Sequence, residues 1–188
     1  MDLPTLRTER LSLGLVEPSE AGRIATLAGD REVARNTESI PHPYPEPEAE
    51  TFVERIRQQV GAGAAAVFAV RLADAGEEDG ELIGMIGLHP ESEHERAGLG
   101  YWIGRPYWDR GYATEAGREV IRWGFDERRL RRIYAESFSR NEASCRVLEK
   151  LGMRREGVLR SHFRKWDEFV DVVVYGLLRS EWEEEGGG

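Results

Sequence analysis

Apolar residues recur along this chain with two spacings, and the spacing predicts which segments are strands and which are helices. Alternating apolar residues, and short apolar runs bounded by turn residues, predict strands. Apolar residues at every third or fourth position predict amphipathic helices. The expected strands are residues 10–16, 66–72, 81–88, 99–104, 132–138, 157–164 and 168–178. The expected helices are a short one that opens at residue 18, then residues 30–35, 49–60, 113–125 and 141–151.

The segments between these elements are polar or rich in glycine and proline. Residues 41–47 carry a proline at every second position, which excludes a regular helix or a central strand and predicts a stiff, extended connection. Residues 76–80 and 165–167 predict hairpin turns, and residues 89–96 predict a polar loop. No repeat or linker divides the chain, so we expect one domain over residues 1–180 and a flexible, acidic, glycine-rich tail over residues 181–188.

The composition is that of an ordinary soluble protein with one hydrophobic core. The chain has 188 residues, of which 40% are hydrophobic and 32% are charged, which suits a single domain. No apolar run approaches the roughly 20 residues that a membrane-spanning helix needs, and the first residues lack the apolar stretch of a signal peptide. The single cysteine, Cys145, excludes an internal disulfide and favours the cytoplasm. The net charge of −9 argues against nucleic acid as a partner and favours a cationic one, such as an amine.

The chain is organised around residues 107–116, which join the strand at 99–104 to the helix at 113–125. A loop that enters a helix presents several backbone N–H groups without partners in the helix, at the positive end of the helix dipole. Such a helix N-terminus binds phosphate; Gly111 and Ala113 leave the approach free of bulk, and Arg110 can add a charge. The sequence has neither the lysine-containing loop of P-loop proteins nor the G-x-G-x-x-G pattern of dinucleotide folds. It therefore predicts a phosphate site of another kind.

This loop, Tyr-Trp-Asp-Arg-Gly-Tyr-Ala-Thr-Glu-Ala, resembles the acetyl-CoA pyrophosphate loop of the GNAT N-acetyltransferases, most of all that of the RimJ/RimL branch. Residues 8–13, 141–153 and 170–175 are also similar to members of that branch. The resemblance implies an α/β fold of the α+β type, with a central mixed, mostly antiparallel sheet of about seven strands flanked by helices. Its fourth and fifth strands are expected to splay apart. The resemblance also implies direct transfer of an acetyl group from acetyl-CoA to a primary amine, so that Cys145 needs no nucleophilic role.

By the same resemblance, the cofactor has several groups of contacts. Its pyrophosphate is expected on the backbone amides of six loop residues, Asp109, Arg110, Gly111, Tyr112, Ala113 and Thr114. Its pantetheine arm is expected between the splayed strands, paired with the strand edge formed by Tyr101, Trp102 and Ile103. Asn141 resembles a ligand of the pantetheine arm, and Ser144 resembles the hydroxyl that donates a hydrogen bond to the leaving thiolate. Met153 stands where the family usually has an aromatic residue.

Two carboxylates that relatives often carry are replaced in this chain. Gly98 stands where many have a glutamate before the Gly-Tyr-Trp strand, and Phe163 stands where a RimL-like enzyme has its proposed base. The remaining candidates for taking the proton from the amine are Glu136, His89 and His162, since an imidazole titrates near neutral pH. A proton relayed through water would also suffice. Ser144 and Glu136 are the pair that we carry forward as catalytic candidates.

The acceptor and the partners stay open at this stage. The family precedent is the N-terminal α-amino group of a ribosomal protein, but the branch also holds enzymes for small amines and aminoglycosides. A non-catalytic module that binds acyl-CoA is a third reading, because two carboxylates are replaced. The histidines and glutamates of residues 89–95 lack the spacing of a metal site, so we expect no metal. We expect no nucleic acid or membrane as partner, and the frequency of homodimers among relatives makes a second copy of the chain an expected partner.

Overall fold

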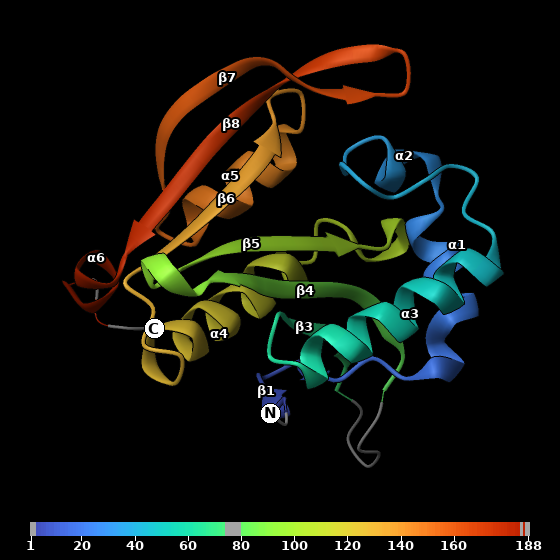
Figure 1. The fold of residues 1–188 in the computed structure, drawn as a ribbon, viewed down its shortest axis with the longest axis horizontal. Helices are drawn as coiled ribbons and strands as arrows, with labels where there is room; N and C mark the ends of the chain where they lie inside the picture. The colour runs from blue at the N-terminus through green and yellow to red at the C-terminus, as the bar shows by residue number, and fades with distance from the viewer. Residues whose placement is uncertain (1–2, 74–79, 185, 187–188) are drawn as a thin grey trace.

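The computed structural model describes residues 3–73, 80–184 and 186, and its strands form one eight-stranded sheet (Figure 1). The strands lie in the order β1-β2-β3-β4-β5-β6-β8-β7, and all neighbours are antiparallel except β5 and β6, which are parallel. The strands are β1 (Leu6–Arg7), β2 (Leu11–Gly14), β3 (Ala66–Leu72), β4 (Leu82–Glu91), β5 (Arg96–Ile103), β6 (Arg132–Phe138), β7 (Arg154–Lys165) and β8 (Glu168–Leu178). The α-helices are α1 (Ala21–Ala28), α2 (Arg31–Ala34), α3 (Glu46–Gly61), α4 (Tyr112–Asp126), α5 (Glu142–Lys150) and α6 (Arg179–Glu184). Short 3-10 turns cover Pro18–Glu20, Ser92–His94 and Arg105–Tyr107.

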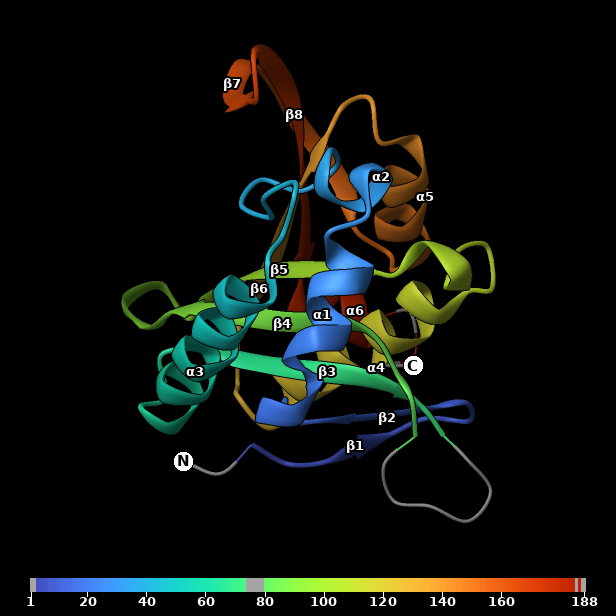
Figure 2. The same ribbon diagram turned by 90° about the vertical axis from the view of Figure 1, so that its right-hand side faces the viewer.

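Helices cover both faces of this sheet (Figure 2). On one face, α1 and α3 bury their apolar sides, and Val53 of α3 belongs to the same cluster as Met85 of β4. On the other face, α4 and α5 do the same, and Ile121 of α4 belongs to the cluster of Ile86. Because successive residues of a strand point to opposite faces, β4 serves both cores. None of the helices in the described part of the chain is long and apolar enough to cross a membrane.

The fold class and most element positions confirm the expectations from the sequence. The strands at residues 66–72, 132–138 and 168–178 occur where the pattern places them. The sheet has eight strands instead of about seven, because the short β1 pairs with β2 and places Leu6 opposite Leu13. Ser12 of β2 is only 2% exposed, so this strand is buried on both faces and not on one. The turn expected at residues 76–80 lies, except for residue 80, outside the described residues.

Several segments differ from the expectation for local reasons. Residues 89–96 are mainly strand and a 3-10 turn, because the β4–β5 ladder continues to the pair Glu91↔Arg96. α3 begins at Glu46, inside the segment expected to be extended. Pro47 is tolerated there because the N–H it lacks would have no acceptor in the first helical turn. β7 begins at Arg154, three residues earlier than expected, where its ladder with β8 already runs.

The end of the chain is more ordered than its composition indicates. Residues 179–184 form α6, and Trp182 is only 8% exposed, with its ring 6.1 Å from that of Phe125 between centroids. Burial of a large indole against the core offsets the acidic, glycine-rich composition of this segment. The frayed tail expected from residue 181 is therefore corrected to helix over residues 181–184.

The two parallel strands part from each other halfway along their length. β5 and β6 pair from Arg96↔Arg132 to Leu99↔Ala135, and both strands continue beyond the last of these four pairs. From residue 100 to 103, the described partner of β5 is β4 alone. The fourth and fifth strands expected from the sequence, at residues 99–104 and 132–138, are β5 and β6. The expected splay between them is thus confirmed, and it leaves one edge of β5 facing an opening in the sheet.

The tip of the β7–β8 hairpin reaches across this opening to the segment between α1 and α3 (Figure 1). Lys165, at the end of β7, is 5% exposed, and its Nζ donates to the carbonyl oxygens of Glu38 at 3.3 Å and Ile40 at 2.7 Å. The Trp166 ring lies 6.2 Å from the ring of His42 between centroids. These contacts of Lys165 and Trp166 with residues 38–42 cover the side of the opening that faces away from α4 and α5, and we refer to this cover as the roof.

Candidate active site

The loop before α4 has the geometry of an anion-binding site. Gly111 is the N-cap of α4 with φ of +81°, and Asp109 has φ of +60°. Left-handed residues alternating with right-handed ones turn successive backbone N–H groups toward one side, and the first turn of the helix adds further free N–H groups. Gly111 is exposed, and a Cβ placed on it would come no closer than 3.5 Å to Arg10 Nη2. All six loop residues predicted to bind pyrophosphate lie in this turn.

Two residues from the start of the chain hold the loop in place, and the sequence analysis did not assign them to the site. The Glu115 carboxylate on α4 accepts hydrogen bonds from Thr8 Oγ1 at 2.6 Å, Arg10 N at 2.9 Å and Arg10 Nε at 2.7 Å. Arg10 Nη1 also donates to the carbonyl oxygen of Arg110 at 3.0 Å, and its guanidinium lies over the Tyr112 ring. Burial raises the pKa of Glu115, but these hydrogen bonds outweigh it and leave that pKa below its ordinary value.

The signal for these residues was present in the sequence. Residues 8–10 and Glu115 both fall in segments that resemble the family, but they lie more than 100 positions apart. Only the fold shows that β1 and β2 lie beside the start of α4.

The loop is joined directly to the free edge of β5. Trp108 Nε1 donates to the carbonyl oxygen of Ile103 at 2.7 Å, which fixes the loop to the end of the strand. Tyr107 is held by Arg23 Nη2, at 2.8 Å from its hydroxyl, and donates to Glu81 at 2.9 Å. The side chains of Tyr107 and Trp108 are therefore structural, and the predicted edge at residues 101–103 runs straight into the predicted phosphate loop.

The start of α5 lies behind this edge, on the face that carries α4. Asn141 is the N-cap of α5, and its Oδ1 accepts the Ser144 N–H at 3.2 Å, the usual role of an asparagine at a helix start. Ser144 Oγ lies 2.8 Å from the Tyr101 hydroxyl of β5. Burial raises the pKa of Tyr101 to about 12, so this phenol stays protonated and can donate to Ser144. Two predicted site residues thus meet across the parted strands.

The opposite face of β5 carries an unusual gap in its row of side chains. Gly98 and Gly100 occupy two neighbouring positions of β5 on this face, where any side chain would project. His89 of β4 lies directly opposite Gly98. A Cβ on Gly98 would lie 3.2 Å from the Tyr134 hydroxyl, and a Cβ on Gly100 would lie 4.0 Å from His89 Nε2. Neighbouring side chains thus lean over both glycines.

A hydrogen-bonded group of charged and phenolic side chains continues along this face. The Glu91 carboxylate accepts from Tyr134 Oη at 2.7 Å and from Arg96 Nη2 at 2.6 Å. Hydrogen bonds from Arg96 and Tyr134 hold the pKa of Glu91 below its ordinary value. Desolvation lowers the pKa of the His89 imidazole, although the residue remains accessible to solvent.

The other proton-acceptor candidates lie on different parts of the site. Glu136 is exposed on β6, one residue beyond the last pair with β5, and its pairing opposite Val174 places it on the same face as Tyr134. Phe163 packs with Phe138, Val170 and Val172, so an apolar wall replaces the carboxylate expected in a RimL-like enzyme. His162 is exposed on β7, and its ring lies beside that of Phe163.

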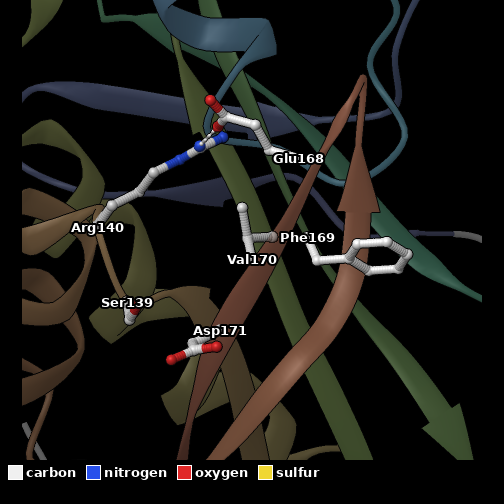
Figure 3. A pocket seen from close by; sticks show the side chains of 6 residues that line it. All are labelled: Ser139, Arg140, Glu168, Phe169, Val170 and Asp171. Carbon is white, nitrogen blue, oxygen red and sulfur yellow. Dashed lines mark hydrogen bonds and ion pairs between the residues drawn. The ribbon is translucent and has the colours of Figure 1, made fainter.

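A shallow pocket lies where the end of β6 is beside the start of β8 (Figure 3). Arg140 extends across it, and its Nη1 donates to Glu168 at 2.7 Å while its Nη2 donates to the carbonyl oxygen of Arg35 at 2.9 Å. Arg140 therefore ties β8 to the segment after α2. The pocket is lined by Ser139, Arg140, Glu168, Phe169, Val170 and Asp171. In the described part of the chain, no cluster of three or more histidine, cysteine, aspartate or glutamate side chains could hold a metal ion.

Comparison with known proteins identifies a family for most of the chain. Residues 10–154 match the family described as "Acetyltransferase (GNAT) domain". An uncharacterized N-acetyltransferase of Bacillus licheniformis, p20, is 30% identical over 96% of this chain and 99% of its own length. A GNAT-family acetyltransferase of Bacillus anthracis superposes with a TM-score of 0.80 at 28% identity, over 94% of this chain and 99% of that one. The ribosomal-protein-S5-alanine acetyltransferase of Vibrio fischeri shares the fold, with a TM-score of 0.80 at 21% identity over 95% and 98% of the two chains.

Proposed function

This chain belongs to the GNAT acetyltransferase family, and we propose that within it the protein acetylates the N-terminal α-amino group of a polypeptide, as the RimJ/RimL branch does. Membership makes the protein an acetyl-CoA-dependent acyltransferase that acts on an amine. The acceptor class and the roles of single residues are the proposal. The observation that carries it is the opening between β5 and β6, with the phosphate loop at one end and a roofed face at the other.

The residues present fit acetyl-CoA. The left-handed residues Asp109 and Gly111 offer a cradle of N–H groups to a pyrophosphate, and a Cβ on Gly111 would lie 3.5 Å from Arg10 Nη2 at the edge of this loop. The edge of β5 at residues 100–103 has backbone groups to offer to the two amides of a pantetheine arm, as a strand does to its neighbour. Asn141 and Ser144, at the start of α5, flank the same opening.

Acetyl transfer at the end of this opening needs one group that holds the amine and one that stabilises the negative charge that develops on the departing sulfur. Acetyl-CoA supplies a thioester whose carbonyl carbon is open to attack. Ser144, held by Tyr101, donates a hydrogen bond toward the departing sulfur from the α5 side. Glu136, on the opposite face, attracts the acceptor in its ammonium form by its negative charge. The two catalytic candidates thus approach the reacting carbon from opposite faces of the sheet.

The roof over the acceptor side supports a chain terminus as the acceptor. Lys165 bonds to Glu38 and Ile40, and Arg140 bonds to Arg35 and Glu168, so two cations tie the hairpin to the segment after α2. We infer that a lysine on the surface of a folded protein is disfavoured as the acceptor by such a bridge. A flexible N-terminus or a small amine can thread beneath it.

The experiment compares four acceptors with purified protein and acetyl-CoA, and reads out thiol release together with the mass of the product. The acceptors are a peptide with a free N-terminal alanine, the same peptide with a blocked N-terminus and an internal lysine, a small arylalkylamine and an aminoglycoside. We expect the free N-terminus to be acetylated and the blocked peptide to be inert. Preference for the arylalkylamine or the aminoglycoside would replace the proposed acceptor. Binding of acetyl-CoA without thiol release on all four would favour an acyl-CoA-binding module.

A further inference from the structure

His89 stands beside the open position that Gly100 leaves on β5. Gly98 lies directly opposite His89 on β5. His89 Nε2 would lie 4.0 Å from a Cβ on Gly100. Any larger residue at position 100 would fill the space in front of the imidazole. Gly100 is also the first residue of β5 beyond its last pair with β6. The imidazole therefore faces the point at which the sheet opens.

This point is where the reacting carbon falls if the cofactor lies as proposed. Residues 100–103 span about 10 Å at the rise of a strand, and the phosphate loop follows them after the short 3-10 turn Arg105–Tyr107. A pantetheine arm has two amide units and a thioethyl end. An arm that starts at the loop and follows this edge delivers its thioester near Gly100. We propose that His89 is the general base of this enzyme and takes the proton of the acceptor amine in place of the missing carboxylate at position 98, an inference that rests on the proposed function.

The groups around His89 leave its imidazole as the available proton acceptor. Glu91, one pleat further along β4, is already committed to Arg96 of β5 and Tyr134 of β6. The side chains of α3 that face this side of the sheet are apolar. Glu136, another carboxylate on this face of the sheet, lies on the far strand β6. Desolvation lowers the pKa of His89, which keeps the imidazole neutral and able to accept a proton at neutral pH.

The step balances with the groups at hand. The ammonium group of the acceptor first gives one proton to His89 Nε2, directly or through one water. The neutral amine nitrogen then forms a bond to the acetyl carbonyl carbon, and its second proton leaves to solvent as the amide forms. The carbon–sulfur bond breaks, and the sulfur keeps the electron pair as a thiolate that Ser144 stabilises. The imidazolium then releases its proton to solvent, which His89 reaches because it is exposed on this face. No oxidant, reductant or metal takes part.

The test compares His89→Gln and His89→Ala with His94→Ala, a second exposed histidine in the turn after β4. Acetyl-CoA affinity is measured first by titration calorimetry, and kcat/KM is then followed from pH 5 to 9 on the acceptor that the wild-type protein acetylates fastest. We expect both His89 variants to bind acetyl-CoA as the wild type does and to lose about 100-fold in kcat/KM. In the wild type, kcat/KM also falls at acidic pH with a midpoint below 6.5, the ordinary pKa of histidine. That limb should vanish in both variants, while the limb from the amine's own ionisation remains.

A readout without turnover accompanies the kinetics. In the free protein, the imidazole NMR signals assigned to His89 by their loss in His89→Gln should titrate below pH 6.5 and shift when the amine is added. Free imidazole should restore part of the activity of His89→Ala but not of His89→Gln, which keeps the space filled. Intact acetyl-CoA binding with an unchanged pH profile in both His89 variants would overturn the role of His89 alone. Absence of acetyl-CoA binding in the wild type would overturn the proposed function and this inference together.

Discussion

The Tyr101 hydroxyl and Ser144 Oγ lie 2.8 Å apart, although one belongs to β5 and the other to a helix that follows β6. The backbones of β5 and β6 no longer pair at this level of the sheet. A side-chain hydrogen bond therefore spans the opening where the backbone ladder has ended. It fixes the direction of the Ser144 hydroxyl before any ligand enters, which is the preorganisation that charge stabilisation requires.

Ser144→Ala should slow turnover while leaving the affinity for acetyl-CoA nearly intact. In the proposed mechanism the hydroxyl acts on the charge that develops at sulfur, so its loss should reduce kcat by about 10- to 100-fold, at the low end of such effects. Stopped-flow thiol release and calorimetry on the same preparation measure the two quantities. Tyr101→Phe keeps the Ser144 hydroxyl but frees its rotation, so it should lose less than Ser144→Ala does. Equal turnover in Ser144→Ala and wild type would make Ser144 an ordinary helix residue.

Gly111→Asp should abolish acetyl-CoA binding without unfolding the domain. An aspartate at this exposed, left-handed position places a negative charge where we propose that the pyrophosphate binds. Gly63→Asp is the matched control, since Gly63 also has a positive φ, of +71°, and open space around its Cα, but lies far from the loop in sequence, at the end of α3. Both variants should lose similar stability in thermal unfolding, and only Gly111→Asp should give a flat titration. Unchanged affinity in Gly111→Asp would contradict the assignment of the loop.

Glu115→Gln should loosen the phosphate loop and weaken acetyl-CoA binding by roughly tenfold, because the neutral amide cannot replace the charge-assisted bonds to Thr8 and Arg10. Arg122→Ala removes an ion pair with Glu119 further along α4 and serves as the control, with little effect expected from an exposed pair.

The same carboxylate gives a pH dependence with a definite sign. The pKa of Glu115 is lower in the folded protein than its ordinary value of 4.5, so its contribution to stability is present above that pH and is lost as the pH falls below it. The free energies of unfolding of wild type and Glu115→Gln should thus differ at pH 6 and converge as the pH falls below 4.5. Denaturant titrations at several pH values check this, and a constant difference across the range would rule out the linkage.

Lys165→Met should free the hairpin tip from the segment after α2. The methionine keeps the buried stem but leaves the carbonyl groups of Glu38 and Ile40 without their donor, at a cost of about 1–3 kcal/mol. We expect KM for the acceptor to rise while acetyl-CoA affinity stays the same, since the phosphate loop is untouched. Arg164→Met changes the exposed neighbour instead and should leave both quantities near wild type. An unchanged free energy of unfolding in Lys165→Met would show that the bridge contributes nothing.

The sequence predicted those parts of the fold that follow from local periodicity. Strands such as Ala66–Leu72 and Arg132–Phe138 were located correctly because their apolar runs are bounded by turn residues. The short β1 was missed because two residues carry no period, and their pairing opposite Leu13 and Ser12 is a tertiary property. α6 was missed because its acidic composition hides one buried indole, that of Trp182. Composition alone cannot show such a contact.

The candidate site also has parts that the sequence predicted and parts that only the fold shows. The turn of the predicted phosphate loop and the N-cap at Asn141 were predicted because each is carried by a continuous motif, and the splay followed from the resemblance to the family. Arg10 and Lys165 gained their places only from the fold, through contacts with residues that lie far away in sequence. His89 was one of three proton-acceptor candidates from the sequence, and only the strand pairing shows that it lies opposite Gly98. Gly98 could be read only as a lost carboxylate in the sequence. In the structure, it lies directly opposite His89, and the Tyr134 side chain packs against it.

If acetyl-CoA lies along the free edge of β5 as proposed, the parting of β5 from β6 makes the stability of this protein depend on its supply of cofactor. A strand edge that ends without a neighbour is completed when an extended ligand lies along it, so the ligand acts as a piece of secondary structure. Only the folded chain offers that edge, and mass action therefore adds about 2.7 kcal/mol to the free energy of unfolding at a ligand concentration of 100 times Kd. Amide hydrogen exchange at residues 100–103 should slow accordingly, because a rung of the sheet is then supplied by a metabolite.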